Sequence, residues 1–218
     1  MTSSRILLAL GAAAAAIGFA GAASAQDFTP KEKGRWIVNM RVTSVAPEEK
    51  GSILTAAGVD TGLDVKVDND TIPSLGIAYF LTDHVAIDVT LGTSKHEIRA
   101  VGGATDVNVH DSWVLPPVVA AQYHFNPKGR LSPYVGTGPN YMLFYGGKDK
   151  NGFKVKLKDG FGWALQGGVD YAIKDNWSLN VDVKKIWFST DANINKGALK
   201  SSVDLDPWVI SAGLGYRF

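Results

Sequence analysis

The sequence predicts an all-β fold, an eight-stranded antiparallel transmembrane β-barrel, and three observations carry this prediction. Residues 203–218 (VDLDPWVISAGLGYRF) alternate apolar with small or polar residues, and aromatic rings lie at both ends of the apolar face, as on a membrane strand. The longest apolar run after the N-terminal region, residues 113–121, is about nine residues long and too short for a membrane helix. The alternating segments are joined by long and short connections in turn, which is typical of outer-membrane barrels.

The N-terminal region has the pattern of a cleaved signal peptide over residues 1–25. Arg5 precedes an apolar run of about fifteen residues, and Ala23-Ser24-Ala25 supplies a cleavage site before Gln26. No anchor follows this run, so a membrane helix fits it less well. Residues 26–218 contain no cysteine, and they carry 21 acidic residues against 21 basic ones, which are the 22 of the whole chain less Arg5. This charge balance argues against nucleic acid as a partner.

The first three expected strands lie at residues 35–43, 74–81 and 85–92. In the first, Trp36 and every second residue after it are apolar, while the residues between them are mostly polar. A long segment rich in glycine and charged residues, about residues 46–70, separates it from the second strand. Only Thr82-Asp83-His84 joins the second strand to the third, which predicts a tight hairpin.

The rest of the chain repeats this alternation of strands with long and short connections. In order, we expect a long loop at about 96–112, a strand at 113–125, a short link at 126–131, a strand at 133–143, a long loop at 146–159, a strand at 161–173, a tight turn at 174–176, a strand at 177–184, a long loop at about 188–202 and the closing strand at 203–218.

The loop lengths predict how the barrel is oriented. Outer-membrane barrels have short periplasmic turns and long outer loops, so residues 26–218 should form a barrel with four extracellular loops and both termini in the periplasm. A soluble barrel of the lipocalin type would place its apolar residues inside, whereas here the smaller and charged residues take the inward face. Aromatic residues gather at the expected periplasmic ends (Trp36, Tyr79, Tyr123, Phe125, Tyr134, Tyr171, Trp177, Tyr216, Phe218) and at the extracellular ends (Trp113, Tyr141, Phe144, Phe161, Trp163, Trp187, Trp208).

Five segments, spread over seven strands and roughly half of the mature chain, resemble the outer-membrane protein W (OmpW) family. They are YFLTDHVAIDV (79–89), LPPVVAAQYHFNP (115–127), SPYVGTGPNY (132–141), GWALQGGVDYAIKDNWSLNVDV (162–183) and the closing segment 203–218. The resemblance implies a Gram-negative outer membrane and an apolar lumen linked to uptake of small hydrophobic molecules. It also implies that the Phe-ended terminus, with Tyr216 and Phe218, is an assembly signal for the outer-membrane insertion machinery.

Polar and charged residues on the inward face would meet inside a barrel too narrow for an open aqueous channel. Charges at membrane depth must pair or contact water. Two interpretations stay open: a structural salt-bridge core, or a plug that blocks flow along the barrel and directs cargo elsewhere. The residues are Arg41, Asp88, Gln122, His124, Gln166, Asp170, Asp182, Lys184 and Arg217.

Apolar residues on the inward face of the extracellular half could form a cup that holds a hydrophobic molecule. They could equally pack against one another or against loops. The candidates are Val114, Pro116, Val118, Met142, Phe144, Ile186 and Val209.

Prolines in two neighbouring strands predict a weakly bonded seam. Pro116 and Pro117 lie in the fourth strand and Pro139 in the fifth, and the expected hairpin brings Pro139 close to Pro117. Proline donates no backbone hydrogen bond, so a lateral exit between strands four and five is one interpretation. The other is that prolines are tolerated at strand ends.

Catalysis is not predicted. His84, His96, His110 and His124 have no metal-ligand spacing, and Gly102-Gly103 precedes no helix that would make a phosphate-binding loop. His110-Asp111-Ser112 contains the H-x-S of the lipid A deacylases, also eight-stranded barrels, but no acidic partner is identified. We therefore expect no catalytic residue, cofactor or metal. The leading hypothesis is a channel or transporter for small hydrophobic ligands, and the alternatives are a structural or surface-interaction barrel of the adhesin kind and a lipid-modifying enzyme.

Overall fold

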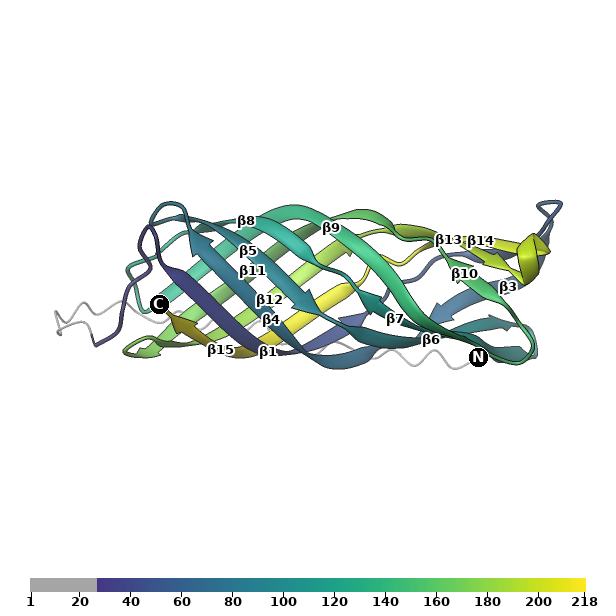
Figure 1. The fold of residues 1–218 in the computed structure, drawn as a ribbon, viewed down its shortest axis with the longest axis horizontal. Helices are drawn as coiled ribbons and strands as arrows, with labels where there is room; N and C mark the ends of the chain where they lie inside the picture. Colours follow the sequence, from purple (N-terminus) through teal and green to yellow (C-terminus); the bar gives the residue numbers. More distant parts are fainter. Residues whose placement is uncertain (1–26) are drawn as a thin grey trace.

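The computed structural model describes residues 27–218, and eight of its strands close into an antiparallel barrel (Figure 1). The predicted signal peptide and its cleavage site lie outside the described residues. Each strand pairs with the next in the order that follows, and β15 pairs back to β1 and β12, which confirms the predicted fold class. The strands are β1 (Trp36–Ala46), β4 (Asp70–Phe80), β5 (Val85–Gly92), β8 (Val118–His124), β9 (Leu131–Asp149), β11 (Gly160–Lys174), β12 (Trp177–Trp187) and β15 (Trp208–Arg217).

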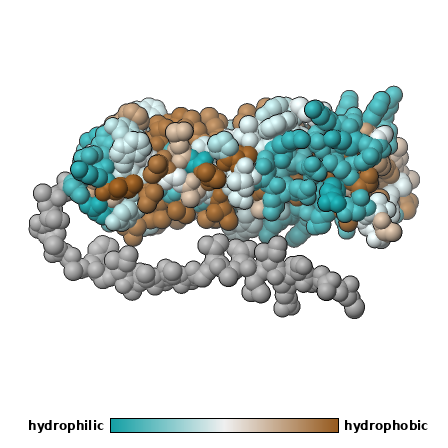
Figure 2. Space-filling view, turned by 90° about the horizontal axis from the view of Figure 1, so that it is seen from below, coloured by the Kyte–Doolittle hydropathy of each residue, from teal (hydrophilic) through white to brown (hydrophobic). Residues whose placement is uncertain are grey.

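Side chains alternate between the lumen and the outer surface, as the period of two predicts. Along β8 every second residue from Val118 to His124 is buried and the residues between them are exposed. Figure 2 shows the consequence on one face of the molecule, where a hydrophobic band crosses the barrel and hydrophilic surface lies on either side of it. Tyr134 and Phe144 correct the predicted aromatic girdles: Tyr134 is buried in the lumen, and Phe144 packs against the buried apolar cluster inside it. Both occupy even positions of β9, whose even residues face inward.

The prediction of four long loops is wrong, because most residues of these segments form strands. These strands prolong the barrel wall as a second sheet, in the order β10-β13-β14-β2-β3-β6-β7-β9. The long strand β9 belongs to both sheets (Figure 1). The strands are β2 (Ser52–Thr55), β3 (Asp60–Val67), β6 (Ser94–Gly102), β7 (Thr105–Leu115), β10 (Val155–Leu157), β13 (Ser189–Ile194) and β14 (Leu199–Asp204), with the short 3₁₀ helix η1 (Asn195–Gly197).

The sequence did not predict this second sheet, because the outer face of the sheet contacts water. Glycine and charged residues therefore replace the apolar residues that mark a membrane strand, and only the inward apolar positions remain as a signal. We call the end of the molecule formed by this sheet the loop end, and the opposite end, which carries Phe218, the terminal end. Among residues 27–218, no helix is long and apolar enough to cross a membrane.

Prolines divide two of the predicted strands. The strand expected at 113–125 is interrupted at Pro116 and Pro117, which separate β7 from β8, and the closing strand expected at 203–218 is interrupted before Trp208 by Pro207. A proline has no N–H to give to a neighbouring strand, so the ladder stops at these positions. Each interruption lies where the barrel meets the loop-end sheet.

Candidate functional site

The lumen has two regions, a polar plug towards the terminal end and an apolar chamber towards the loop end. Every predicted plug residue is inward and buried: Arg41, Asp88, Gln122, His124, Gln166, Asp170, Asp182, Lys184 and Arg217. They come from strands on all sides of the barrel, because a period-two face on each strand turns to the same axis.

Asn180, which the sequence reasoning missed, connects the charged residues of the plug. Its side-chain oxygen accepts a hydrogen bond from Arg41 Nε at 2.6 Å, and its nitrogen donates to Asp170 Oδ1 at 2.8 Å and to the Tyr134 hydroxyl at 3.1 Å. Tyr134 in turn donates to Asp182 Oδ2 at 2.8 Å. Both ends of one amide are thus used to join a cation to two carboxylates, which keeps the buried charges paired.

The plug residues nearest the chamber form fewer hydrogen bonds. The amide of Gln166 has no hydrogen-bond partner among residues 27–218, and Asp88 keeps a bond only from Thr90, at 2.9 Å to Oδ2. Lys184 forms an ion pair with Asp182. Fewer hydrogen bonds have to break to rearrange these residues than to rearrange the network around Asn180.

The N-terminal segment, residues 27–35, crosses the terminal end and is bonded to it. Lys31 is fully buried, and its Nζ lies 2.6 Å from Asp170 Oδ2 and 3.0 Å from His124 Nδ1. Thr29 donates from its backbone N to Asp175 at 2.7 Å, and its carbonyl accepts from Arg217. The segment therefore closes the plug from outside the barrel strands. Nothing in the local pattern around Lys31 signals this role, because the residue precedes the first alternating segment.

The chamber gathers the predicted cup residues. Its cavity has a volume of about 70 Å³ and is lined by Val114, Pro116, Met142, Phe144, Ile186 and Val209, together with residues of the loop-end sheet. Val118 does not line this cavity but packs in the same buried cluster. The loop-end contribution, which the sequence reasoning missed, is a second apolar cluster that includes Ile53, Val65, Val109, Val155, Ile194 and Val203. The signal that could have found it is the spacing of these apolar residues within polar segments.

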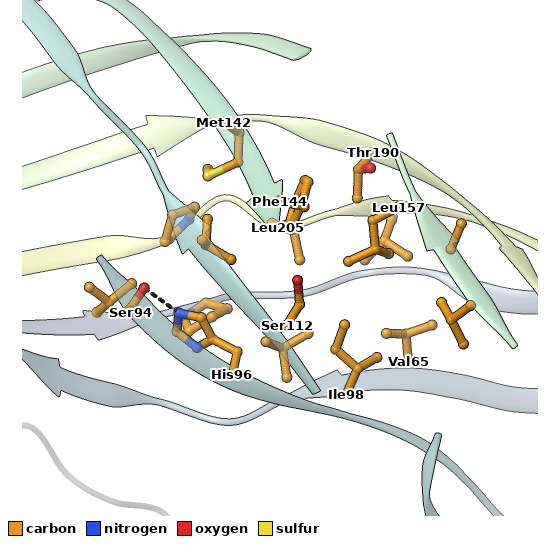
Figure 3. Close-up of a pocket in the computed structure, with 18 of the residues that line it drawn as sticks. Val65, Ser94, His96, Ile98, Ser112, Met142, Phe144, Leu157, Thr190 and Leu205 are labelled. Atoms are coloured by element: carbon orange, nitrogen blue, oxygen red, sulfur yellow. Dashed lines mark hydrogen bonds between the residues drawn. The ribbon is translucent and has the colours of Figure 1, made fainter. Parts of the chain in front are cut away.

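Among the polar residues of this lining, three lie close together (Figure 3). Ser94 and His96 lie on β6, and Ser112 lies on β7 directly opposite His96. Nε2 of His96 is 2.8 Å from Ser94 Oγ, and its Nδ1 is 2.7 Å from the backbone oxygen of Asp68.

The residues of the H-x-S pattern are not brought together as a catalytic group. Ser112 lines the chamber, whereas His110 does not, and Nδ1 of His110 lies 3.0 Å from Asp149 Oδ1. An irregularity in the pairing of β7 at Asp111–Trp113 turns the two residues apart. Among residues 27–218, no group of three histidine or acidic side chains could hold a metal ion.

Asp111 organises charge on the outside of the loop end. Its Oδ2 lies 3.3 Å from Nζ of Lys95 and 3.3 Å from Nζ of Lys150, and Asn108 donates to its Oδ1 at 3.0 Å. Burial raises the pKa of Asp111, but the hydrogen bonds from Asn108, Lys150 and Lys95 outweigh it and bring the pKa below its usual value. The carboxylate therefore ties β6, β7 and the end of β9 together when it is charged.

The predicted proline seam lies where β7 gives way to β8. The pairing of Val118 with Asn140 sets Pro139 opposite Val119, as expected. The N–H of Tyr141 donates to the carbonyl of Pro117 at 3.1 Å, and Pro117 can return no bond. Pro117 and Pro139 thus each remove a donor from the contact between β8 and β9.

The same strand is also weakened on its other edge. Backbone groups of successive residues in a strand point to opposite neighbours, so the donor that Pro116 lacks would face β5. Gly92 is the residue opposite Pro116 in the register shared by β5–β8 and β6–β7, and no backbone hydrogen bond joins the two within the described chain. The junction of β7 and β8 is therefore held loosely on both sides.

Comparisons with known proteins agree with this architecture. The family whose sequence model matches the chain is the OmpW family, over residues 32–218. The outer-membrane protein y4mB of Sinorhizobium fredii is 39% identical over 214 residues, which cover 96% of this chain and 91% of that protein. Outer membrane protein W of Escherichia coli is 33% identical over 198 residues, which cover 86% of this chain and 90% of that protein. The crystal structure of the outer membrane protein OprG from Pseudomonas aeruginosa has 28% sequence identity and a TM-score of 0.83, and the match covers 88% of this chain and 99% of that chain.

Proposed function

Because the chain belongs to the OmpW family and is a barrel of the Gram-negative outer membrane, we propose that it carries small hydrophobic molecules across that membrane. The observation that supports this most is the apolar chamber at the loop end. A buried, apolar, partly open cavity above a polar plug suits a ligand that avoids water. We place the loop end outside the cell and both termini in the periplasm, because the short turns lie at the terminal end.

In this proposal the ligand enters the chamber from the loop end and leaves sideways. Below the chamber lie the buried charges of the plug, and an apolar molecule would have to displace their hydrogen bonds to pass along the barrel. The junction of β7 and β8 offers less resistance, since prolines there remove backbone donors. The ligand then reaches the hydrophobic layer of the membrane without meeting water.

Binding to the chamber is tested with a fluorescent apolar probe and purified protein. Phe144→Asp and Val118→Asp each place a charge in the apolar cluster and should abolish probe binding. Val59→Asp is the matched control, because Val59 is 63% exposed on the loop end outside the chamber. Unchanged probe binding by folded Phe144→Asp and Val118→Asp proteins would contradict the proposal.

The exit is tested with disulfides that lock the strands. Leu115→Cys with Leu143→Cys joins β7 to β9 just above the seam, and Tyr123→Cys with Val135→Cys joins β8 to β9 far below it as a control. We expect only the upper disulfide to slow hydrophobic uptake, and reduction to restore it. Lys95→Cys with Trp113→Cys locks the other edge of the same junction. An effect of that pair alone would move the exit to the β5 side, and uptake unchanged by both pairs would refute a lateral exit.

A second candidate function, recognition at the cell surface, is favoured by the polar exterior of the loop end (Figure 2). Deleting the loop-end segments would not separate the two functions, because residues such as Ile53 and Ile194 also line the chamber. Charge reversals on the outer surface do separate them, for example Lys158→Glu with Asp191→Lys. Loss of binding to a host cell or phage with normal uptake would indicate a receptor or adhesin role.

A further inference from the structure

We propose that Ser94, His96 and Ser112 form a polar anchor that holds the hydroxyl group of an otherwise apolar ligand, such as an aliphatic alcohol. This inference rests on the proposed function of the chamber and specifies its substrate class. It does not follow from an apolar cavity alone, since such a cavity would take an alkane equally well. The argument comes from where the three side chains lie and from which of their hydrogens are already used.

The three side chains share one part of the chamber wall. Ser94, His96 and Ser112 are 1%, 5% and 2% exposed, so each is buried, and all three line the cavity (Figure 3). His96 and Ser112 are direct cross-strand partners, which places their Cβ atoms about 4.5–5.5 Å apart. One ligand group can therefore reach more than one of the three.

The hydrogens of the anchor are committed to protein acceptors. The backbone oxygen of Asp68 can only accept, so Nδ1 of His96 carries a hydrogen, and in the tautomer with its one hydrogen there, Nε2 accepts from the Ser94 hydroxyl. The hydroxyl of Ser112 donates to the carbonyl of Trp113 at 3.2 Å. The two serine oxygens still have free lone pairs, which can accept hydrogen bonds from a ligand.

The other polar residues of the lining do not change this balance. The Thr190 hydroxyl donates to the carbonyl of Lys158 at 2.8 Å and accepts from its N–H at 3.2 Å. Arg99 is the cation among the described lining residues, and its guanidinium pairs with Asp106. Within the described lining, the serine oxygens thus offer acceptors, and the cation Arg99 is already paired with Asp106.

Ligand classes differ in how well they match these serine acceptors. An alcohol donates to a serine oxygen and keeps every protein bond in place. An ester or ketone can only accept, so one serine must give up its existing bond, and an alkane leaves the buried oxygens unmatched. A carboxylate is the poorest ligand, because its charge would enter a mainly apolar wall whose cation, Arg99, already pairs with Asp106.

The size of the cavity limits what fits without rearrangement. Its volume of about 70 Å³ is smaller than the roughly 150 Å³ cavity that accommodates benzene in an engineered protein. A chain of more than a few carbon atoms must therefore push aside flexible residues of the lining. Met142 is the best suited to this, because its unbranched side chain adapts its shape readily.

The experiment measures displacement of a fluorescent apolar probe from the full-length mature barrel in lipid nanodiscs. The competitors are octane, 1-octanol, methyl heptanoate and octanoate, each corrected for its partitioning into empty nanodiscs. Ser94→Ala and Ser112→Ala remove the acceptors one at a time. Ser201→Ala is the control, because this buried serine bonds to the carbonyl of Ser52 and does not line the chamber.

We expect 1-octanol to displace the probe at the lowest concentration and octanoate at the highest. Ser94→Ala and Ser112→Ala should each lower the preference for octanol over octane by about 3- to 10-fold, the value of one hydrogen bond, while Ser201→Ala leaves it unchanged. Two serine variants are used so that one which fails to fold does not decide the outcome.

Other outcomes overturn the inference in distinguishable ways. If octane and octanol displace the probe equally and the serine variants change nothing, the anchor is refuted and the chamber still binds apolar ligands. If octanoate displaces it best, Arg99 rather than the serines selects the ligand, and the anchor is again refuted. If no competitor displaces the probe, the proposed function fails together with the anchor.

Discussion

Replacing Lys31 by methionine should destabilise the barrel by about 3–5 kcal/mol, because it leaves a buried carboxylate without its cation. The side chains of Lys31 and Asp170 are 0% and 4% exposed, and 2.6 Å separates Nζ from Oδ2, so water screens this pair very little. Asn180 keeps its bond to Asp170, which offsets a small part of the loss. The N-terminal segment, residues 27–35, remains attached through Thr29, so the measured effect reports mainly on the unpaired charge.

The assay is urea unfolding in lipid vesicles, followed by the fluorescence of the six tryptophans. Lys33→Met is the control, since Lys33 is exposed two residues along the same segment. Combining Lys31→Met with Asp170→Asn removes both charges, so the double variant should be more stable than the sum of the single effects by about 1–3 kcal/mol. A Lys31→Met protein within about 0.5 kcal/mol of the unsubstituted protein, or purely additive effects, would refute the reasoning.

Three further predictions concern other parts of the molecule. Gly138→Ala should lower stability by more than about 1 kcal/mol in the same unfolding assay, because a Cβ there would overlap the backbone oxygen of Val119. Gly167→Ala should not lower stability in this way, because the nearest atom to its Cβ would be 3.9 Å away. Because the pKa of Asp111 is lowered in the folded protein, its stabilising effect is present above about pH 4 and is lost as the pH falls through the lowered pKa. Protection of the β7 amides from hydrogen exchange should therefore drop at that pH. Asp111→Asn should flatten this pH dependence. Deletion of Phe218 should reduce the amount of barrel assembled in the outer membrane, measured by heat-dependent gel migration, more than the uptake per assembled barrel. Equal losses of both would contradict the expectation, implied by the family resemblance, that Phe218 belongs to an assembly signal.

The sequence alone determined the barrel and the direction in which its side chains face. A membrane strand shows its apolar face to lipid and its polar face to the lumen, so a period of two is readable at every residue from Val118 to His124. For the same reason the plug residues and most of the cup were predictable: once a strand's outward face is known, the alternate residues must point inward. Tyr134 and Phe144 are the exceptions among the predicted girdle residues, because their rings lie on the inward face of the strand and not on the face that meets lipid.

Only the tertiary structure decided how these parts join. The loop-end strands pair through backbone groups that any residue carries, so segments rich in glycine and charge give little local sign that they extend the wall. Lys31 reaches Asp170 across 139 residues, and Ser112 faces His96 because β6 and β7 share a register. Contacts of this kind depend on pairing between distant segments, whereas alternation is a property of each strand by itself. The chamber and its polar anchor therefore emerge only when the strands are assembled.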